Sequence, residues 1–463
     1  LLGNGSWCIA LGGRDCSFQI NEQKLVALSI TEELYEYEIA QATKEGHTLF
    51  AEVLKKDSRV LKTMEEQAER FGEAVKLNSA STFECSVSEQ DFFFMEMNTR
   101  IQVEHRVTDM VYSLKFTNPN DAGDSFIVES LVEAMTLIAA HGARLPRPER
   151  VVRNRAGGEI RLNATNDALQ PSAGGMIERW SEPAEKEVRD DQGIGIRNPD
   201  TGWFIKYHLA GAYDSNVALV VSHGRGRKEN LANLSDILRR MELRGADLAT
   251  NLDFHYGVLN ICLGLHPMLK PDTKFVIPYL AGVGSLATRM ESFDLSTAWK
   301  SIQNQIKERF GPSGLETLNV KQTLLWRPLQ ELLRRPHAAA GWLVLNNRRA
   351  FAIKNGRVAW KRNPLRILSD LYHFLNLEGR DKAPPVMQIW AHDHELLENG
   401  LRFYSDLEKS LSCDTEKEYR YSLTTTADNT SHLYEDLNQK LLSDSNPYSG
   451  SGDYRAIDDA TYA

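Results

Sequence analysis

The sequence predicts an α+β protein, because segments with the two-residue period of strands alternate with segments that have the period of helices. Residues 81–87 and 92–98 are rich in β-prone side chains and flank a turn-forming stretch, which predicts an antiparallel hairpin. Residues 32–78 carry apolar side chains at three- and four-residue spacing among many Glu and Lys, which predicts amphipathic helices. A β-rich stretch to about residue 220, followed by a helix from about residue 228 to 244, completes the alternation.

Composition narrows the class of protein. The chain has 463 residues, a length typical of about three domains. Its net charge of −9 argues against a nucleic-acid-binding protein, which needs a basic surface to neutralise phosphates. No targeting peptide and no apolar run of about 18 residues is present, so we expect no membrane association. Five scattered cysteines without CxxC spacing fit a reducing compartment, and we expect a cytoplasmic protein.

The predicted hairpin has a polar face. Successive side chains of a strand alternate between faces, so Glu96, Asn98 and, if the strand continues, Arg100 lie on the same side. Antiparallel pairing would bring Glu84 beside Glu96. Two carboxylates with an amide suit a hard divalent cation such as Mg²⁺, which prefers oxygen ligands. The alternative is an ordinary solvated edge hairpin, since charged strand faces are common.

Three ordered segments resemble the biotin carboxylases, the ATP-grasp components of acetyl-CoA, propionyl-CoA and pyruvate carboxylases. The first is MEMNTRIQVEHRVTD at residues 95–109, and the second is LGGRDCSFQINEQK at residues 11–24. The third runs from residue 158 to 251 through GEIRLNAT, PSAGGMI, EVRDD, YDS and RGADLATN. The resemblance covers about residues 1–262 and implies an ATP-grasp ligase.

The resemblance also implies a domain order. We expect the C-terminal part of an ATP-grasp domain over residues 1–113, an insertion with a connecting helix over 114–150, and a biotin carboxylase C-terminal domain over 151–265. A mostly helical extension with a small β-meander would follow over 266–412, and a polar tail over 413–463. The family's N-terminal domain and ATP lid have no counterpart in the sequence. We therefore expect a fragment, or one part of a split enzyme.

Site residues follow from the same motifs. In the resembled family, ATP phosphorylates bicarbonate to carboxyphosphate, which delivers CO₂ to carrier-bound biotin. The resemblance implies that Glu104 is the base and that Arg100 holds the anion, with Lys24 near it. Arg189 matches the arginine that stabilises the biotin enolate. Gln19, Gln102 and Val103 match substrate-binding residues. Glu84, Glu96 and Asn98 match ligands for Mg²⁺ or Mn²⁺.

Partners and alternatives complete the expectation. No Met-Lys-Met motif for covalent biotin is present, so the biotin carboxyl carrier protein and the carboxyltransferase are expected on other chains. The family often forms homodimers. Two residues depart from the family pattern: Arg106 stands where a proline is usual, and Glu22 where His or Asn is usual. These departures favour, as an alternative, a non-catalytic assembly or regulatory subunit on a degenerate ATP-grasp scaffold. A carbamoyl-phosphate type ligase fits the RDCS segment and the Arg189 region less well.

Overall fold

The computed structural model describes most of the chain as two compact units. It describes residues 1–361 except 21–22, 89–90, 173, 181–187, 190–193, 211–214, 242, 266–267, 269–270 and 355–356. Beyond residue 361 it describes only 371, 374–375, 387–389 and 455–457, so nearly all of the predicted tail (413–463) lies outside the described residues. The first unit comprises residues 1–164, 171–237 and 243–248, and the second the remainder. The predicted domain boundaries stay a prediction.

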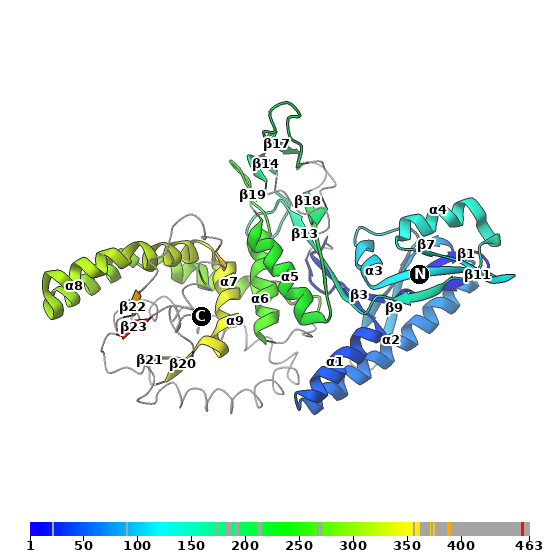
Figure 1. Cartoon of the computed structure of the whole chain (residues 1–463), viewed down its shortest axis with the longest axis horizontal. Coiled ribbons are helices and arrows are strands. Elements are labelled where there is room, and N and C mark those ends of the chain that lie inside the picture. Colours follow the sequence, from blue (N-terminus) through cyan, green and yellow to red (C-terminus); the bar gives the residue numbers. More distant parts are fainter. Residues whose placement is uncertain are drawn as a thin grey trace. The chain divides into compact units, whose positions relative to one another are not determined.

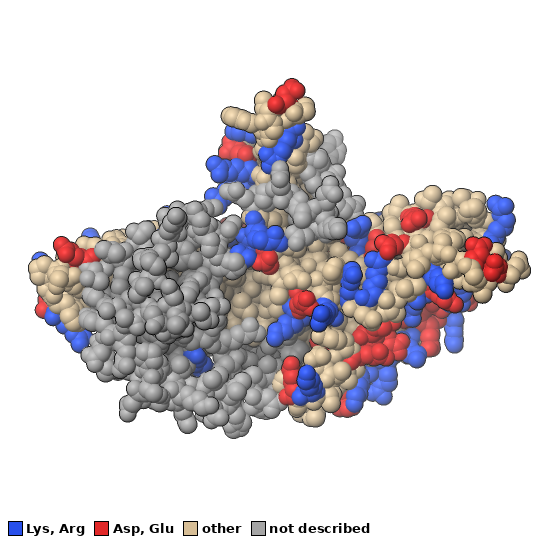
Figure 2. All heavy atoms as spheres, viewed as in Figure 1, with Lys and Arg blue, Asp and Glu red and all other residues tan. Residues whose placement is uncertain are grey.

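The first unit opens with a small sheet and two helices. Strands β1 (Leu2–Asn4), β2 (Cys8–Ile9) and β7 (Asn78–Ala80) form the sheet. The predicted helices are confirmed as α1 (Glu32–Lys44) and α2 (Thr48–Ala74), which lie side by side in Figure 1. The side chain of Thr31 caps α1 by accepting a hydrogen bond from the backbone N–H of Leu34 at 3.1 Å. Figure 2 shows positive and negative side chains interspersed over these helices.

A five-stranded antiparallel sheet forms the centre of the first unit. Its order is β16-β18-β13-β6-β3. The strands span Val188–Arg189, Asn216–Gly224, Ala156–Asn163, Val26–Ile30 and Gly13–Asp15. Strand β13 is buried along almost its whole length, and helix α5 (Arg227–Arg240) follows β18. Through β6, which pairs with both β13 and β3, this sheet joins two of the three segments that carried the resemblance, residues 11–24 and the one from residue 158.

The predicted hairpin is confirmed. Strands β8 (Thr82–Val87) and β9 (Phe92–Asn98) pair antiparallel, and the register places Glu84 opposite Glu96. A shift in register after Glu84 marks a bulge. The chain then enters α3 (His105–Val111), while the short pair β4 (Gln19–Ile20) and β5 (Gln23–Lys24) carries Lys24.

The insertion is a hairpin rather than the predicted loop. The Asn, Pro, Gly and Asp residues of segment 115–126 predict an irregular loop, followed by a helix from Phe126. Instead, β10 (Tyr112–Asn118) and β11 (Asp121–Val128) pair antiparallel around a short turn. The rings of Phe116 and Phe126 stack with centroids 5.4 Å apart, and this cross-strand contact supports β11, in which only Val128 is buried. The following helix therefore begins at Leu131, capped by Ser130, and not at Phe126.

The remaining elements of this unit are short. Strand β12 (Glu149–Val152) pairs with β10, within residues 143–157, a basic stretch interrupted by proline that predicts a connector. Strand β14 (Gly174–Ile177) pairs with β17 (Tyr207–Ala210), and β15 (Arg179–Trp180) pairs with β19 (Leu243–Arg244). Helix α4 (Leu131–His141) and a 3₁₀ turn (Gly142–Arg144) lie between β11 and β12 in the chain.

The second unit is mostly helical. Its helices are α6 (Leu252–Leu265), α7 (Val276–Glu291), α8 (Leu295–Arg334, kinked at Gly311) and α9 (Pro336–Ala350). Four short strands form two antiparallel pairs: Phe351–Lys354 pairs with Arg357–Trp360, and Met387–Ile389 pairs with Arg455–Ile457. No helix in the described part of the chain is long and apolar enough to cross a membrane.

One predicted element of the second unit is wrong in its first half. The β-meander was expected over residues 341–360, but residues up to Ala350 belong to α9, and only Phe351–Lys354 and Arg357–Trp360 pair as strands. A short apolar run such as 341–345 has no period that separates a buried helix from a strand. Close packing against α6, visible in Figure 1, decides for the helix.

Gly257 allows the close contact between α6 and its neighbours. A Cβ atom at this position would overlap the hydroxyl of Tyr279 and lie 2.6 Å from the carbonyl oxygen of His337. Gly257→Ala is therefore expected to destabilise the second unit by about 1–3 kcal/mol, as overpacking of a core usually does. Thermal unfolding of the two proteins measures the change.

A matched control is available on α7. Gly284 has nothing within 4 Å of an added Cβ, so Gly284→Ala is expected to be neutral or to stabilise the helix by about 0.5–1 kcal/mol. Equal unfolding temperatures for Gly257→Ala and the wild type would show that α6 moves away without cost.

Candidate active site

A cluster of polar side chains gathers where the β8–β9 hairpin, β5 and the loop before α3 meet. The structure brings together six of the ten residues that the sequence predicted, namely Lys24, Glu84, Glu96, Asn98, Gln102 and Glu104. They come from segments up to 80 residues apart in the chain. Most of these side chains are connected through hydrogen bonds to two carboxylates, those of Glu84 and Glu104.

Glu84 is the first of these two carboxylates. Its Oε1 atom accepts hydrogen bonds from three nitrogen donors: Lys24 Nζ at 2.9 Å, Asn98 Nδ2 at 3.0 Å and Gln102 Nε2 at 2.7 Å. Partial burial favours the neutral acid, but the bonds from Lys24 and Gln102 outweigh it and lower the pKa of Glu84. The carboxylate is therefore ionised at neutral pH.

Glu96 faces Glu84 across the hairpin. The two residues are direct partners in the β8–β9 register, and the amide of Asn98 donates to both carboxylates, at 3.0 Å to Glu84 and 3.1 Å to Glu96. Two carboxylates and one amide form a set of oxygen donors that a hard divalent cation prefers. The set fits such a cation once the Asn98 amide turns its oxygen toward the carboxylates.

This donor set is open rather than a closed protein cage. Among the described residues, no group of three or more His, Cys, Asp or Glu side chains is placed to hold a metal ion. Two carboxylates plus an amide leave several coordination positions for other ligands. Mg²⁺ is commonly held in this way, by one or two carboxylates together with the phosphates of a nucleotide.

Glu104 is the second carboxylate, and it is almost completely buried. Its side chain is 2% exposed, and its two oxygens meet different cations, Lys24 Nζ at 3.1 Å and Arg161 Nη2 at 2.6 Å. Burial favours the neutral acid, but the positive charges of Arg14, Lys24 and Arg161 outweigh it and lower the pKa of Glu104. A buried carboxylate that stays ionised at neutral pH can accept a proton from a bound molecule.

Lys24 links the two carboxylates. Its ammonium group lies within hydrogen-bonding distance of both Glu84 and Glu104. Burial on its own would lower the pKa of Lys24, but the bond to Glu84 and the negative charge of Glu104 raise it above the ordinary lysine value. Lys24 is therefore a permanent positive charge between the candidate metal ligands and the candidate base.

Two arginines of the site were missed by the sequence reasoning. Arg161, on β13, contacts Glu104, and Arg14, on β3, donates to the Gln102 Oε1 atom at 2.5 Å and to the hydroxyl of Thr108 at 3.2 Å. Both lie inside the segments that carried the resemblance, GEIRLNAT and GGRDCS. Their presence in these segments was the available signal, but their partners are 57 and 88 residues away in the sequence.

Three predicted residues lie near the cluster without the contacts that link its members. Arg100 is exposed and its guanidinium donates to the carbonyl oxygen of Ile101 at 3.3 Å. Val103 is exposed, and Gln19 is the strand partner of Lys24 in the β4–β5 pair. An exposed guanidinium two residues beyond Asn98 is available to a bound anion.

Arg189 is placed by its backbone alone. It lies on β16 opposite Leu219 of β18, and Leu219 is also the partner of Arg161 on β13. Arg189 and Arg161 therefore occupy the same register position two strands apart. Of the two departures from the family pattern, Arg106 is exposed on α3, while Glu22 lies outside the described residues.

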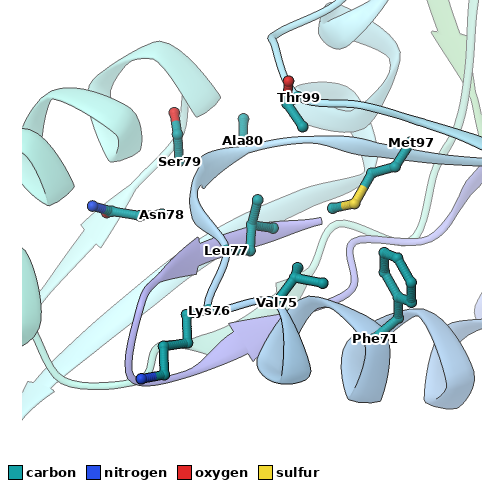
Figure 3. A pocket seen from close by; sticks show the side chains of 9 residues that line it. All are labelled: Phe71, Val75, Lys76, Leu77, Asn78, Ser79, Ala80, Met97 and Thr99. Carbon is teal, nitrogen blue, oxygen red and sulfur yellow. The ribbon is translucent and has the colours of Figure 1, made fainter.

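A separate hollow lies behind the hairpin. It has a volume of about 410 Å³ and is lined by Phe71, Val75, Lys76, Leu77, Asn78, Ser79, Ala80, Met97 and Thr99. Figure 3 shows Met97 above the hollow. Phe71 lies on α2, and Val75 lies at the end of that helix. Since strand side chains alternate, Met97 faces this hollow while Glu96 and Asn98 face the polar cluster. The hairpin thus separates an apolar hollow from the polar cluster.

Similarity to known proteins agrees with this site. Residues 3–117 match the family described as the carbamoyl-phosphate synthase L chain, ATP binding domain. Biotin carboxylase 1 of Bacillus subtilis is 30% identical over 256 residues, which cover 54% of this chain and 46% of that protein. The mitochondrial propionyl-CoA carboxylase alpha chain of Mus musculus is 29% identical over 52% of this chain and 27% of that protein.

Further similarity comes from urea amidolyase of Saccharomyces cerevisiae, which is 28% identical over 56% of this chain and 12% of that protein. A crystal structure of biotin carboxylase from Campylobacter jejuni is 26% identical, with 56% of this chain and 47% of that one covered and a TM-score of 0.41. The chain spans less than half the length of these relatives.

The family match and the polar cluster lie in the same part of the chain, which resembles the ATP-binding domain of that family. More particularly, the relatives and the family match support a biotin carboxylase ATP-grasp fragment over about half of the chain, as the ordered motifs had indicated.

Proposed function

We propose that the protein is the biotin carboxylase component of an acyl-CoA or pyruvate carboxylase, and that this chain supplies its base and its metal ligands. The observation that carries the proposal is the buried, ionised Glu104 held between Lys24 and Arg161. Lys24 also joins Glu104 to Glu84, the strand partner of Glu96. A deprotonating group beside a cation site is what activation of a weak oxygen nucleophile by a nucleoside triphosphate requires.

Each residue has a role in this proposal. Glu84, Glu96 and Asn98 would hold Mg²⁺ or Mn²⁺, which when bound neutralises charge on the phosphates of ATP. Glu104 takes the proton of bicarbonate, and the exposed Arg100 holds the anion through its planar guanidinium. Gln102, which accepts a hydrogen bond from Arg14, and Val103 would line the site that binds bicarbonate. Arg189 would stabilise the biotin enolate during transfer of the carboxyl group from carboxyphosphate to biotin.

The partners are proposals of the same kind. Biotin would arrive on a separate carboxyl carrier protein, and a carboxyltransferase would pass the carboxyl group to its acceptor. The relatives include a propionyl-CoA carboxylase chain and a urea amidolyase, so the acceptor differs among them. We also propose a cytoplasmic location and a homodimer.

The test is the dependence of ATP cleavage on its co-substrates. The natural full-length protein is incubated with MgATP, bicarbonate and free biotin, and ADP release is followed. The proposal expects ADP release that requires bicarbonate and rises with biotin. ADP release that is indifferent to both would contradict it. No ADP release by the folded protein would favour the non-catalytic scaffold, which the exposed Arg106 in place of the usual proline first suggested.

A further inference from the structure

We propose that Lys24 and the divalent cation compete for Glu84, so that loading of the metal moves the Lys24 ammonium group from Glu84 to Glu104. The inference deepens the proposed function and rests on the assignment of Glu84 as a metal ligand. Lys24 is then a positioning residue: its ammonium group contacts both carboxylates without the cation and only Glu104 when the cation is bound.

The first observation is that the Oε1 atom of Glu84 already accepts at least as many hydrogen bonds as its lone pairs allow. The Oε1 atom accepts three N–H donors, from Lys24, Asn98 and Gln102, although a carboxylate oxygen offers about two lone-pair directions. A metal ion that binds this atom must displace donors. The three donors differ in what they can do next.

The second observation identifies the donor that leaves. The Gln102 side chain is fixed from its other end by Arg14, which donates to its Oε1 atom. Asn98 can stay, because a turn of its amide replaces its N–H groups with an oxygen ligand. Lys24 alone has both a second carboxylate already in reach, Glu104 at 3.1 Å, and a charge of the same sign as the cation. Repulsion between the two positive charges therefore drives Lys24 toward Glu104.

The consequence is a coupling between the metal and the base. Before loading, the Lys24 charge balances two carboxylates that would otherwise repel each other. After loading, the cation neutralises Glu84 and the ammonium group is concentrated on Glu104, where the bicarbonate anion is proposed to bind. Metal binding at Glu84 would thus precede proton transfer from bicarbonate to Glu104.

Mn²⁺ binding to the protein tests the competition directly. The free Mn²⁺ signal in electron paramagnetic resonance is titrated against the full chain and its Lys24→Met variant, without nucleotide. The variant is expected to bind Mn²⁺ about tenfold more tightly, a change of the size that coupled binding equilibria usually show. Lys55→Met is the matched control: this half-exposed lysine pairs with Glu52 on α2, and its loss should leave the affinity unchanged.

The outcomes separate this inference from the proposed function. Equal or weaker Mn²⁺ binding by Lys24→Met, with binding intact in the wild type, overturns the competition and leaves the metal site standing. Absence of Mn²⁺ binding in both folded proteins overturns the metal site and the competition together. A gain that persists when Glu84→Gln is added to Lys24→Met would also overturn the competition, because the effect would not act through Glu84.

Discussion

Glu104→Gln is expected to lower bicarbonate-dependent ADP release by about 10²- to 10⁴-fold, the usual contribution of a positioned general base. Glutamine keeps the size of the side chain and can still accept a hydrogen bond, but it cannot take a proton from bicarbonate. The side chain is 2% exposed, so water cannot readily replace it. The loss should appear in kcat for ADP release by the natural full-length protein.

The matched control for this variant is Glu133→Gln, on an exposed position of α4. It makes the same chemical change away from the cluster and should leave the rate unchanged. Circular dichroism and thermal unfolding verify that Glu104→Gln is folded. A folded Glu104→Gln protein with wild-type activity would remove Glu104 from the role of base.

Arg161→Met is expected to have the second largest effect, because it removes the 2.6 Å partner of a buried carboxylate. Loss of a hydrogen bond to a charged group should lower the free energy of unfolding at neutral pH by about 1.5–3 kcal/mol. The pKa of Glu104 is lowered, against the effect of burial, by Arg14, Lys24 and Arg161, so the variant should raise it. Chemical denaturation and the pH profile of kcat/KM measure the two effects.

The direction of the pH effect follows from the lowered pKa. Glu104 is active when ionised, so activity is lost as the pH falls through its pKa, and a higher pKa moves this acidic limb to higher pH. The same carboxylate stabilises the folded protein above the ordinary glutamate pKa, and this contribution is lost as the pH falls through the lowered pKa. In Arg161→Met that contribution is smaller.

Arg161→Lys separates charge from geometry. Lysine keeps the positive charge, so the acidic limb should return most of the way to the wild-type position, while the planar contact of the guanidinium is lost. An acidic limb that does not move in Arg161→Met would show that Lys24 and Arg14 are sufficient to keep Glu104 ionised.

Local sequence was sufficient for the hairpin and for the pairing of its two glutamates. The period of two and the turn at residues 88–91 predicted both strands, and the pairing of Glu84 with Glu96 followed from the turn. Helices α1 and α2 followed from their apolar spacing in the same way. These features depend on neighbours in the chain, which is why they could be predicted before any tertiary contact was known. The family resemblance added Lys24 and Glu104.

Tertiary structure decided the rest. The sequence contains no local sign that Arg161 meets Glu104 or that Arg14 fixes Gln102, because each pair is joined only when β13 and β3 enter one sheet. Packing also overrode local patterns, turning the polar insertion into a hairpin and residues 341–350 into a helix. The residue types of the site were thus determined by the sequence alone. Their charge balance, with one lysine shared by two carboxylates, was decided by the fold, because electrostatic interactions depend on distance in space.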